Sequence, residues 1–244
     1  MKTVAIVQAR VGSTRLPGKV LLDLVGRTVL DRVVQRVRQF TMIDDVIVAT
    51  SSERADNPII DECDRIGVAS FRGSESDVLD RFVGAVRETD ADVCVRLTAD
   101  CPLLDPGVSD NIISLFLLAD DADYASNKIP QSFPRGLDTE VFTRDALERA
   151  AREAREPYER VHVTPYIYRH PEIFSLLSVT SDVDRSDWRW TIDTPEDIEF
   201  VREIYRRLDS RGDFGWQDVV ALLENEPSLM WINSHVLQKE IDQG

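Results

Sequence analysis

Hydrophobic residues follow two different periods along the first half of the chain. Short runs rich in β-branched residues predict four strands, at Thr3–Gln8, 46–50, 68–71 and 93–97. Between them, apolar side chains recur every third or fourth position and predict helices, with stripes at Val29, Leu30, Val33, Val34, Val37 and Phe40, over 58–66, and at Val78, Leu79, Phe82, Val83 and Val86. This alternation predicts βαβ units and a largely parallel sheet.

The second half of the chain is less regular. Between 124 and 142 the pattern is interrupted by Pro130, Pro134 and Gly136, which is typical of an excursion that faces a substrate. A helix is predicted over 144–155.

A strand ending at Ile192 should lead into a strongly marked helix. Thr194 is a suitable N-cap, Pro195 suits the first helical position, and acidic residues fill the first turn. The residues from 212 onward predict one more helix and a tail with Trp231 and Val236, which we expect to pack on a partner subunit.

Composition narrows the possible partners. A formal net charge of -15 over 244 residues argues against a nucleic-acid or anionic-membrane surface, which would need clustered cations. No apolar run approaches the roughly 20 residues needed to span a bilayer. The polar residues Gln8 and Arg10 come too early for a signal peptide, so we expect a cytoplasmic protein. The three cysteines, Cys63, Cys94 and Cys101, form no CxxC pair and should be buried, reduced thiols.

A loop rich in glycine and cations follows the first predicted strand. Within Arg10-Val-Gly-Ser-Thr-Arg-Leu-Pro-Gly-Lys19, Gly12 lets the backbone approach an anion, and Arg10, Arg15 and Lys19 supply positive charge. The spacing differs from a P-loop, because five residues separate Gly12 from Gly18 and Val20 replaces the magnesium-binding hydroxyl. A solvated basic turn is the alternative, but the composition favours a triphosphate site.

Two aspartates follow predicted strands. Asp100 comes after 93–97, at the sheet edge that should also hold the glycine loop, and Asp193 follows Ile192. Two carboxylates together with phosphate oxygens and water would suit octahedral Mg²⁺. Asp193 could instead serve in a turn or cap, or bind a second ion while Asp197 faces solvent.

The loop resembles the A-R-x-G-S-x-R-L-P-x-K signature of the cytidylyltransferases that activate 3-deoxy-manno-octulosonate and acylneuraminate. Over residues 1 to about 210 the chain is most similar to the SpsF-like branch of spore coat polysaccharide biosynthesis, through the segments FRGSESDVLDRF, RLTADCPL, FPRGLDTEVF and WTIDTPED. The resemblance implies a Rossmann-like, three-layer α/β/α nucleotidyltransferase fold of the GT-A-like type. We expect one domain with a nucleotide-binding half (1–120), an acceptor and second metal-ligand half (121–210), and a C-terminal helix and tail (211–244).

The resemblance also implies site residues. Asp100 and Asp193 would bind Mg²⁺, and Arg10, Lys19 and Asp100 would carry catalysis. Nucleotide-binding residues would be Gln8, Ala9, Arg10, Gly12, Ser13, Arg15, Lys19, Ser74, Asp77 and Arg81. Ser74 and Asp77 are equally suited to capping the helix that they precede.

Polar residues gathered in the irregular middle section and nearby are candidates for binding the acceptor, namely Asn127, Arg135, Asp138, Glu140, Arg160, His162 and Arg189. A pair such as Arg135 with Arg160 would suit a carboxylate or phosphate, although each residue taken singly is more often part of a surface ion pair. His162 is a better hydrogen-bonding partner than a catalytic base.

The resulting hypothesis is a homodimeric, Mg²⁺-dependent transferase that joins CMP from CTP to a small acidic sugar-like acceptor and releases pyrophosphate. One alternative is a glycosyltransferase that uses a nucleotide-sugar, although Asp100-Cys101-Pro102 offers one acid where an Asp-x-Asp motif would have two. Another is a catalytically silent nucleotide-binding subunit.

Overall fold

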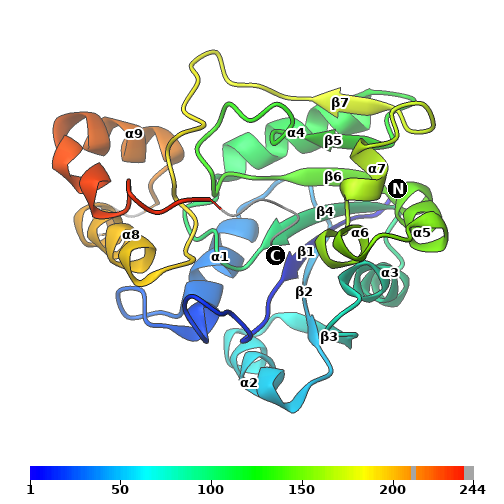
Figure 1. Ribbon diagram of the computed structural model, residues 1–244, viewed down its shortest axis with the longest axis horizontal. Coiled ribbons are helices and arrows are strands. Elements are labelled where there is room, and N and C mark those ends of the chain that lie inside the picture. The colour runs from blue at the N-terminus through cyan, green and yellow to red at the C-terminus, as the bar shows by residue number, and fades with distance from the viewer. Residues whose placement is uncertain (210–212, 239–244) are drawn as a thin grey trace.

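The computed structural model describes residues 1–209 and 213–238, which contain a seven-stranded sheet of order β3-β2-β1-β4-β6-β5-β7 (Figure 1). Strands β1 to β4 are parallel, β6 runs antiparallel to β4 and β5, and β7 is parallel to β5. The strands are β1 (Thr3–Gln8), β2 (Asp45–Ser51), β3 (Ala69–Gly73), β4 (Val93–Thr98), β5 (Tyr124–Ser126), β6 (Glu140–Thr143) and β7 (Leu176–Ser178).

Helices cover both faces of the sheet. One face packs against α1 (Val29–Val37), α2 (Asn57–Ile66), α4 (Pro106–Leu118), α8 (Pro195–Leu208) and α9 (Trp216–Asn225). The other packs against α3 (Val78–Thr89), α5 (Arg144–Glu153), α6 (Pro157–His162) and α7 (Pro165–Tyr168). Short 3₁₀ turns are η1 (Lys19–Leu21), η2 (Arg54–Asp56) and η4 (Pro227–Ile232).

The alternation of side chains along β1 explains the layers. Ala5 and Val7 lie in the core beneath α1, whereas Val4 and Ile6 lie in the core beneath α3, and all four are fully buried. A central strand that is apolar on both faces needs helices on both sides. The predicted three-layer fold with a mostly parallel sheet is therefore confirmed.

Most predicted elements are present, and two predictions need correction. Thr194 caps α8 by accepting a hydrogen bond from the Asp197 backbone, with Pro195 next in the chain. The strand predicted to end at Ile192 is wrong, because residues there form an isolated bridge, Arg135 to Arg189, rather than a ladder. The irregular stretch 124–142 contains β5 and the start of β6, which proline and glycine between them had obscured. The three cysteines are buried and free, as expected.

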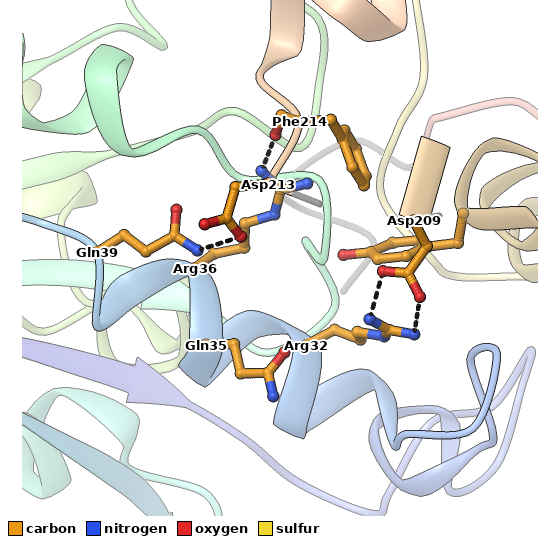
Figure 2. Close-up of a pocket in the computed structure, with 8 residues that line it drawn as sticks. Arg32, Gln35, Arg36, Gln39, Asp209, Asp213 and Phe214 are labelled. Atoms are coloured by element: carbon orange, nitrogen blue, oxygen red, sulfur yellow. Dashed lines mark hydrogen bonds and ion pairs between the residues drawn. The ribbon is translucent and has the colours of Figure 1, made fainter. Parts of the chain in front are cut away.

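Two buried arginines of α1 fasten this helix to the chain on either side of residues 210–212 (Figure 2). Arg32 forms a two-pronged ion pair with Asp209 at 2.9 and 3.0 Å and stacks on Tyr205, while Arg36 donates to the Phe214 carbonyl. They line a cavity of about 50 Å³. Because Arg32 also donates to two loop carbonyls, we assign these contacts to packing rather than to anion binding.

Among the described residues, no helix has the length and apolar character required to cross a membrane.

Candidate active site

The loop after β1 is closed on itself and tied to the next βα unit. The Gly18 backbone N–H donates to the Val11 carbonyl at 3.0 Å, and Gly18 has a φ of 69°, which favours glycine. The Asp56 carboxylate accepts from the Val11 N–H at 2.7 Å and from Ser51. Asp56 is 3 % exposed and was missed in the sequence, where nothing local distinguishes it from other acids.

Three predicted residues meet where this loop ends. The Lys19 ammonium lies 2.5 Å from Asp100 Oδ2 and 2.7 Å from Asp193 Oδ1, although Asp193 is 174 positions away in the sequence. The carboxyl ends of β1 and β4 bring Lys19 and Asp100 together. The Ile192 N–H donates to the Asp100 carbonyl at 2.8 Å, which places Asp193 beside them.

Burial and mutual attraction act in opposite directions on these charges. Burial alone would lower the pKa of Lys19, but Asp100 and Asp193 more than offset it, so the pKa is raised. Burial would likewise raise the pKa of Asp100, yet the neighbouring Lys19 holds this pKa below its usual range. Lys19 and Asp100 are therefore both charged at neutral pH.

These two carboxylates fit part of a metal site. Two oxygens that both contact one nitrogen atom are close enough to share one cation, and carboxylate oxygens are the ligands that Mg²⁺ prefers. Within residues 1–209 and 213–238, no group of three or more His, Cys, Asp or Glu side chains is arranged to hold a metal. The remaining ligands would have to come from water or from phosphate.

Two arginines also form ion pairs with Asp193. Arg15 lies 3.0 Å from Asp193 Oδ2, and Arg189 lies 2.6 Å from the same oxygen. Arg189 also forms an ion pair with Asp197, whose side chain is completely buried. The alternative in which Asp197 faces solvent is therefore wrong, because its position on α8 is covered by Arg189 and Asn233.

Arg81 is a buried cation, and some of its hydrogen-bond donors are unpaired within the described part of the chain. It is 1 % exposed, and its Nη1 donates to the Ser74 carbonyl at 2.9 Å, but its Nε and Nη2 have no partner among the described residues. Burial lowers its pKa to about 10. Gly73 makes room for it, since a Cβ there would lie 2.8 Å from Arg81 Cγ. Unsatisfied buried donors are costly, and an acceptor on a ligand would relieve that cost.

Asp77 caps α3, and Ser74 supports the cap residue. Asp77 is the N-cap of α3 and accepts from the Asp80 N–H, while Ser74 accepts from the Asp77 N–H. Asp77 also pairs with Arg160 at 2.6 Å, and Arg160 donates to the Ala151 carbonyl. Arg135, in contrast, pairs through its backbone with Trp188 and Trp190. Arg135 and Arg160, which the sequence suggested as a pair, therefore have different partners in the structure.

Glu140 belongs to a buried polar network. It forms an ion pair with Arg96, lies 3.6 Å from Lys128, and accepts hydrogen bonds from the Tyr124 and Thr164 hydroxyls. Burial would raise the pKa of Glu140, but Lys128 and Arg96 bring it down to about 2. Arg96 also donates to the Gln8 side chain, so the network reaches the end of β1.

The other acceptor candidates lie along the excursion between β5 and β6 and on α6. Asn127 is fully buried and braces the excursion by bonding Leu137 and Thr139. Asp138 accepts from Gln131, and His162 is a half-buried residue at the end of α6. Arg96, Tyr124, Thr164 and Asn233 were not predicted, because their partners are distant in sequence.

Sequence similarity places the chain in a known family. Residues 4–226 match the sequence profile of the family described as Cytidylyltransferase. The chain is 36% identical over 230 residues to the spore coat polysaccharide biosynthesis protein SpsF of Bacillus subtilis, covering 91% of this chain and 94% of that protein.

Solved structures agree with this match. A cytidylyltransferase from Leptospira borgpetersenii superposes with a TM-score of 0.89 at 33% identity, over 98% of this chain and 100% of the other. CMP:2-keto-3-deoxy-manno-octonic acid synthetase in complex with CTP gives a TM-score of 0.67 at 20% identity, over 85% and 99% of the two chains. At that identity the likeness concerns the fold alone.

Proposed function

Because this chain belongs to the cytidylyltransferase family, we propose that it transfers CMP from CTP to an acidic sugar or a similar small acceptor and releases pyrophosphate. The similarity to SpsF supports a place in the biosynthesis of a surface polysaccharide or glycoconjugate. In this reaction an acceptor oxygen forms a bond to the α-phosphorus of CTP, and the bond from that phosphorus to the β-phosphate oxygen breaks.

One observation carries the proposal. The Lys19 ammonium lies between Asp100 and Asp193 at the end of a glycine loop, so one point of the molecule combines a loop with free backbone approach, a cation and two carboxylates. Transfer of a nucleotidyl group requires all three, because the substrate is a polyanion whose charge must be neutralised and held in line.

Each group of the loop has a role in this proposal. The backbone around Gly12 and the side chains of Arg10 and Arg15 would hold the departing pyrophosphate. Lys19 would turn from the carboxylates toward the phosphates and stabilise the charge that develops there. Its raised pKa keeps it protonated for this purpose.

Asp100 and Asp193 are the proposed ligands of Mg²⁺, which when bound would neutralise phosphate oxygens. Arg81, with its two unpartnered nitrogens, is the proposed donor to the nucleoside. Gln8, Ala9, Ser13, Ser74 and Asp77 are proposed to complete the nucleotide pocket.

Arg135, Asp138 and His162 are the proposed contacts of the acceptor, whereas Arg189, which is buried and paired with Asp193 and Asp197, is proposed to support the metal ligand. Asn127 and Glu140 are buried within the protein, and Arg160 pairs with Asp77, so we propose that these three shape the pocket. Cations at the acceptor side would favour an acceptor that carries a carboxylate or phosphate.

The decisive experiment is a screen for pyrophosphate release. CTP, UTP, ATP and GTP are each incubated with the enzyme, Mg²⁺ and a panel of sugar acids, amino sugars and phosphorylated sugars. We expect release with CTP and one class of acidic acceptor, and loss of release when the metal is chelated. Binding of CTP without pyrophosphate from any combination would instead support a silent nucleotide-binding protein.

A further inference from the structure

The carboxylate of Asp197 lies inside the protein beneath the proposed metal ligand Asp193. It accepts from Arg189 Nε at 2.9 Å and Nη2 at 3.1 Å, and from the backbone N–H groups of Asp193 at 2.9 Å and Thr194 at 3.0 Å. Burial would raise the pKa of Asp197, but the hydrogen bonds and charge of Arg189 lower it. Asp197 is therefore an ionised group whose fixed position depends on its donors.

Arg189 and Asp197 together set the position of Asp193. Asp197 holds the Asp193 backbone, and Arg189 Nη2 donates to Asp193 Oδ2 at 2.6 Å. The other oxygen, Oδ1, is the one that contacts Lys19. Hydrogen bonds of this kind generally orient metal-binding side chains and keep them ready for the ion.

A further donor to Asp197 comes from the segment after α9. Asn233, which is 4 % exposed, donates from its amide to Asp197 Oδ1 at 3.0 Å and to the Arg189 carbonyl at 3.0 Å. Further along, the Gln238 side chain accepts from Arg189 Nη1. We name residues 227–238 the C-terminal strap.

The strap is docked on the body of the protein yet lies beyond the family match, which ends at residue 226. Leu229 is buried in the core, and η4 contacts α8 and α9. Figure 1 shows the red stretch after α9 running past α8 back toward the middle of the molecule. A segment beyond the residues that match the family profile therefore supplies two contacts to Arg189 and one to Asp197.

We propose that the C-terminal strap is a working part of the site and that Asn233 is a positioning residue for Asp193. The inference rests on the proposed function, in which Asp193 binds the metal that accompanies CTP. Without the Asn233 amide, Asp197 loses a donor and the Arg189 backbone loses its tie to the strap. Arg189 then no longer holds Asp193 facing Asp100, so the metal is bound more weakly, although Asn233 itself touches no substrate.

The test compares Asn233→Ala with Asn225→Ala. Asn225, exposed on α9, also donates from its amide to a backbone carbonyl, that of Ala221 at 2.8 Å, so both substitutions remove the same kind of bond. The readouts are the Mn²⁺ dissociation constant, measured by electron paramagnetic resonance with a non-hydrolysable CTP analogue bound, and the Mg²⁺ dependence of kcat. We expect Asn233→Ala to weaken metal binding about 10-fold, with CTP binding in the absence of metal unchanged. Asn225→Ala should match the wild type in both readouts.

A second variant provides the test if Asn233→Ala does not fold. Gln238 is exposed, so Gln238→Ala should fold normally and weaken metal binding about threefold, as expected for the loss of one hydrogen bond. If Asn233→Ala folds with unchanged metal affinity and merely melts at a lower temperature, the strap is only structural and the proposal is overturned. If Asn233→Ala does not fold, an unchanged metal affinity of Gln238→Ala overturns it. If the wild type itself shows no metal-dependent CTP binding, the proposed function fails and the strap proposal falls with it.

Discussion

Lys19 and Asp100 illustrate what single side chains contribute at this site. Asp100 follows the carboxyl end of β4, Lys19 ends the loop that follows β1, and each has its pKa shifted toward the charged form by its neighbour. Charged residues also occur at the opposite ends of the same strands, where Lys2 precedes β1 and Asp92 precedes β4. Lys19 and Asp100 therefore differ from Lys2 and Asp92 in the sheet edge at which they lie, and not in residue type.

Substitution of either central residue should impair catalysis. Lys19→Ala removes a cation that meets developing charge, and Asp100→Asn removes a charged ligand, so each should lower turnover at least ~100-fold. Steady-state pyrophosphate release with CTP measures the effect. Lys2→Ala and Asp92→Asn, the same types of residue at the opposite sheet edge, should leave turnover close to normal. Near-normal activity of both site variants would refute the assignment.

Glu140 should govern stability in acid. Its pKa of about 2 in the folded protein lies below the ordinary 4.5, so its ion pair stabilises the fold fully above pH 4.5 and loses effect as the pH falls toward 2. Glu140→Gln should lower the free energy of unfolding by about 3 kcal/mol at pH 7, and the difference should shrink in acid. Urea denaturation across this range measures it, with the exposed Glu88→Gln as control. A difference that is independent of pH would exclude the ion pair as its cause.

At the scale of elements, the site depends on a close crossing of two segments without regular secondary structure. Gly136 has a φ of 110°, and a Cβ there would lie 2.8 Å from the Trp190 carbonyl carbon and 3.0 Å from the Thr191 nitrogen. The stretch from Trp190 leads directly to Asp193. The position of the proposed metal ligand therefore depends on how the excursion between β5 and β6 packs at this crossing.

Gly136→Ala should consequently lower the free energy of unfolding more than substitution of a glycine that lies in open space. Gly26 has a φ of 80°, but a Cβ there would meet nothing within 4 Å, so Gly26→Ala measures backbone strain alone, about 1 kcal/mol. Gly136→Ala adds a clash and should cost about 3 kcal/mol, with a fall in turnover. Urea unfolding and pyrophosphate release, both measured at 25 °C, would show this. Equal losses of stability would contradict the close crossing.

At the scale of the whole molecule, a chain of net charge -15 concentrates cations around one point. Lys19, Arg15 and Arg189 all contact Asp193 or Asp100, and they come from the first βα loop and the segment before α8. A ligand bound there would join parts of the chain that are distant in sequence.

CTP and Mg²⁺ should therefore stabilise the protein together more than separately. Without nucleotide, Lys19 lies between the two carboxylates and Arg15 and Arg189 pair with Asp193, so the ion alone must displace a cation that has no other anion to meet. At a CTP concentration 100 times its dissociation constant in the presence of Mg²⁺, unfolding should cost about 2.7 kcal/mol more. Thermal melts with each ligand and with both measure this. An equally large shift with Mg²⁺ alone would rule out this competition.

Sequence alone was sufficient for the elements whose cause is local. The stripe on α1, the cap and proline at the start of α8, and the glycine loop after β1 each depend on neighbouring positions, so their periods and residue types predict them. The meeting of Lys19 with Asp100 was also anticipated, because parallel strands bring their carboxyl ends to one edge. Asp193 joins them for a different reason than expected, since it follows a segment that bonds the Asp100 backbone rather than a strand.

Only the tertiary structure decided which polar groups hold that site in place. Asp56, Arg96, Asp197 and Asn233 look like ordinary surface residues in the sequence, and their burial depends on partners many positions away. A buried charge is acceptable only when distant donors or acceptors satisfy it, and the identity of those partners is set by packing of the whole chain. For this reason the chemistry of the site could be inferred from its motifs, whereas its support, including the C-terminal strap, became visible only in the folded molecule.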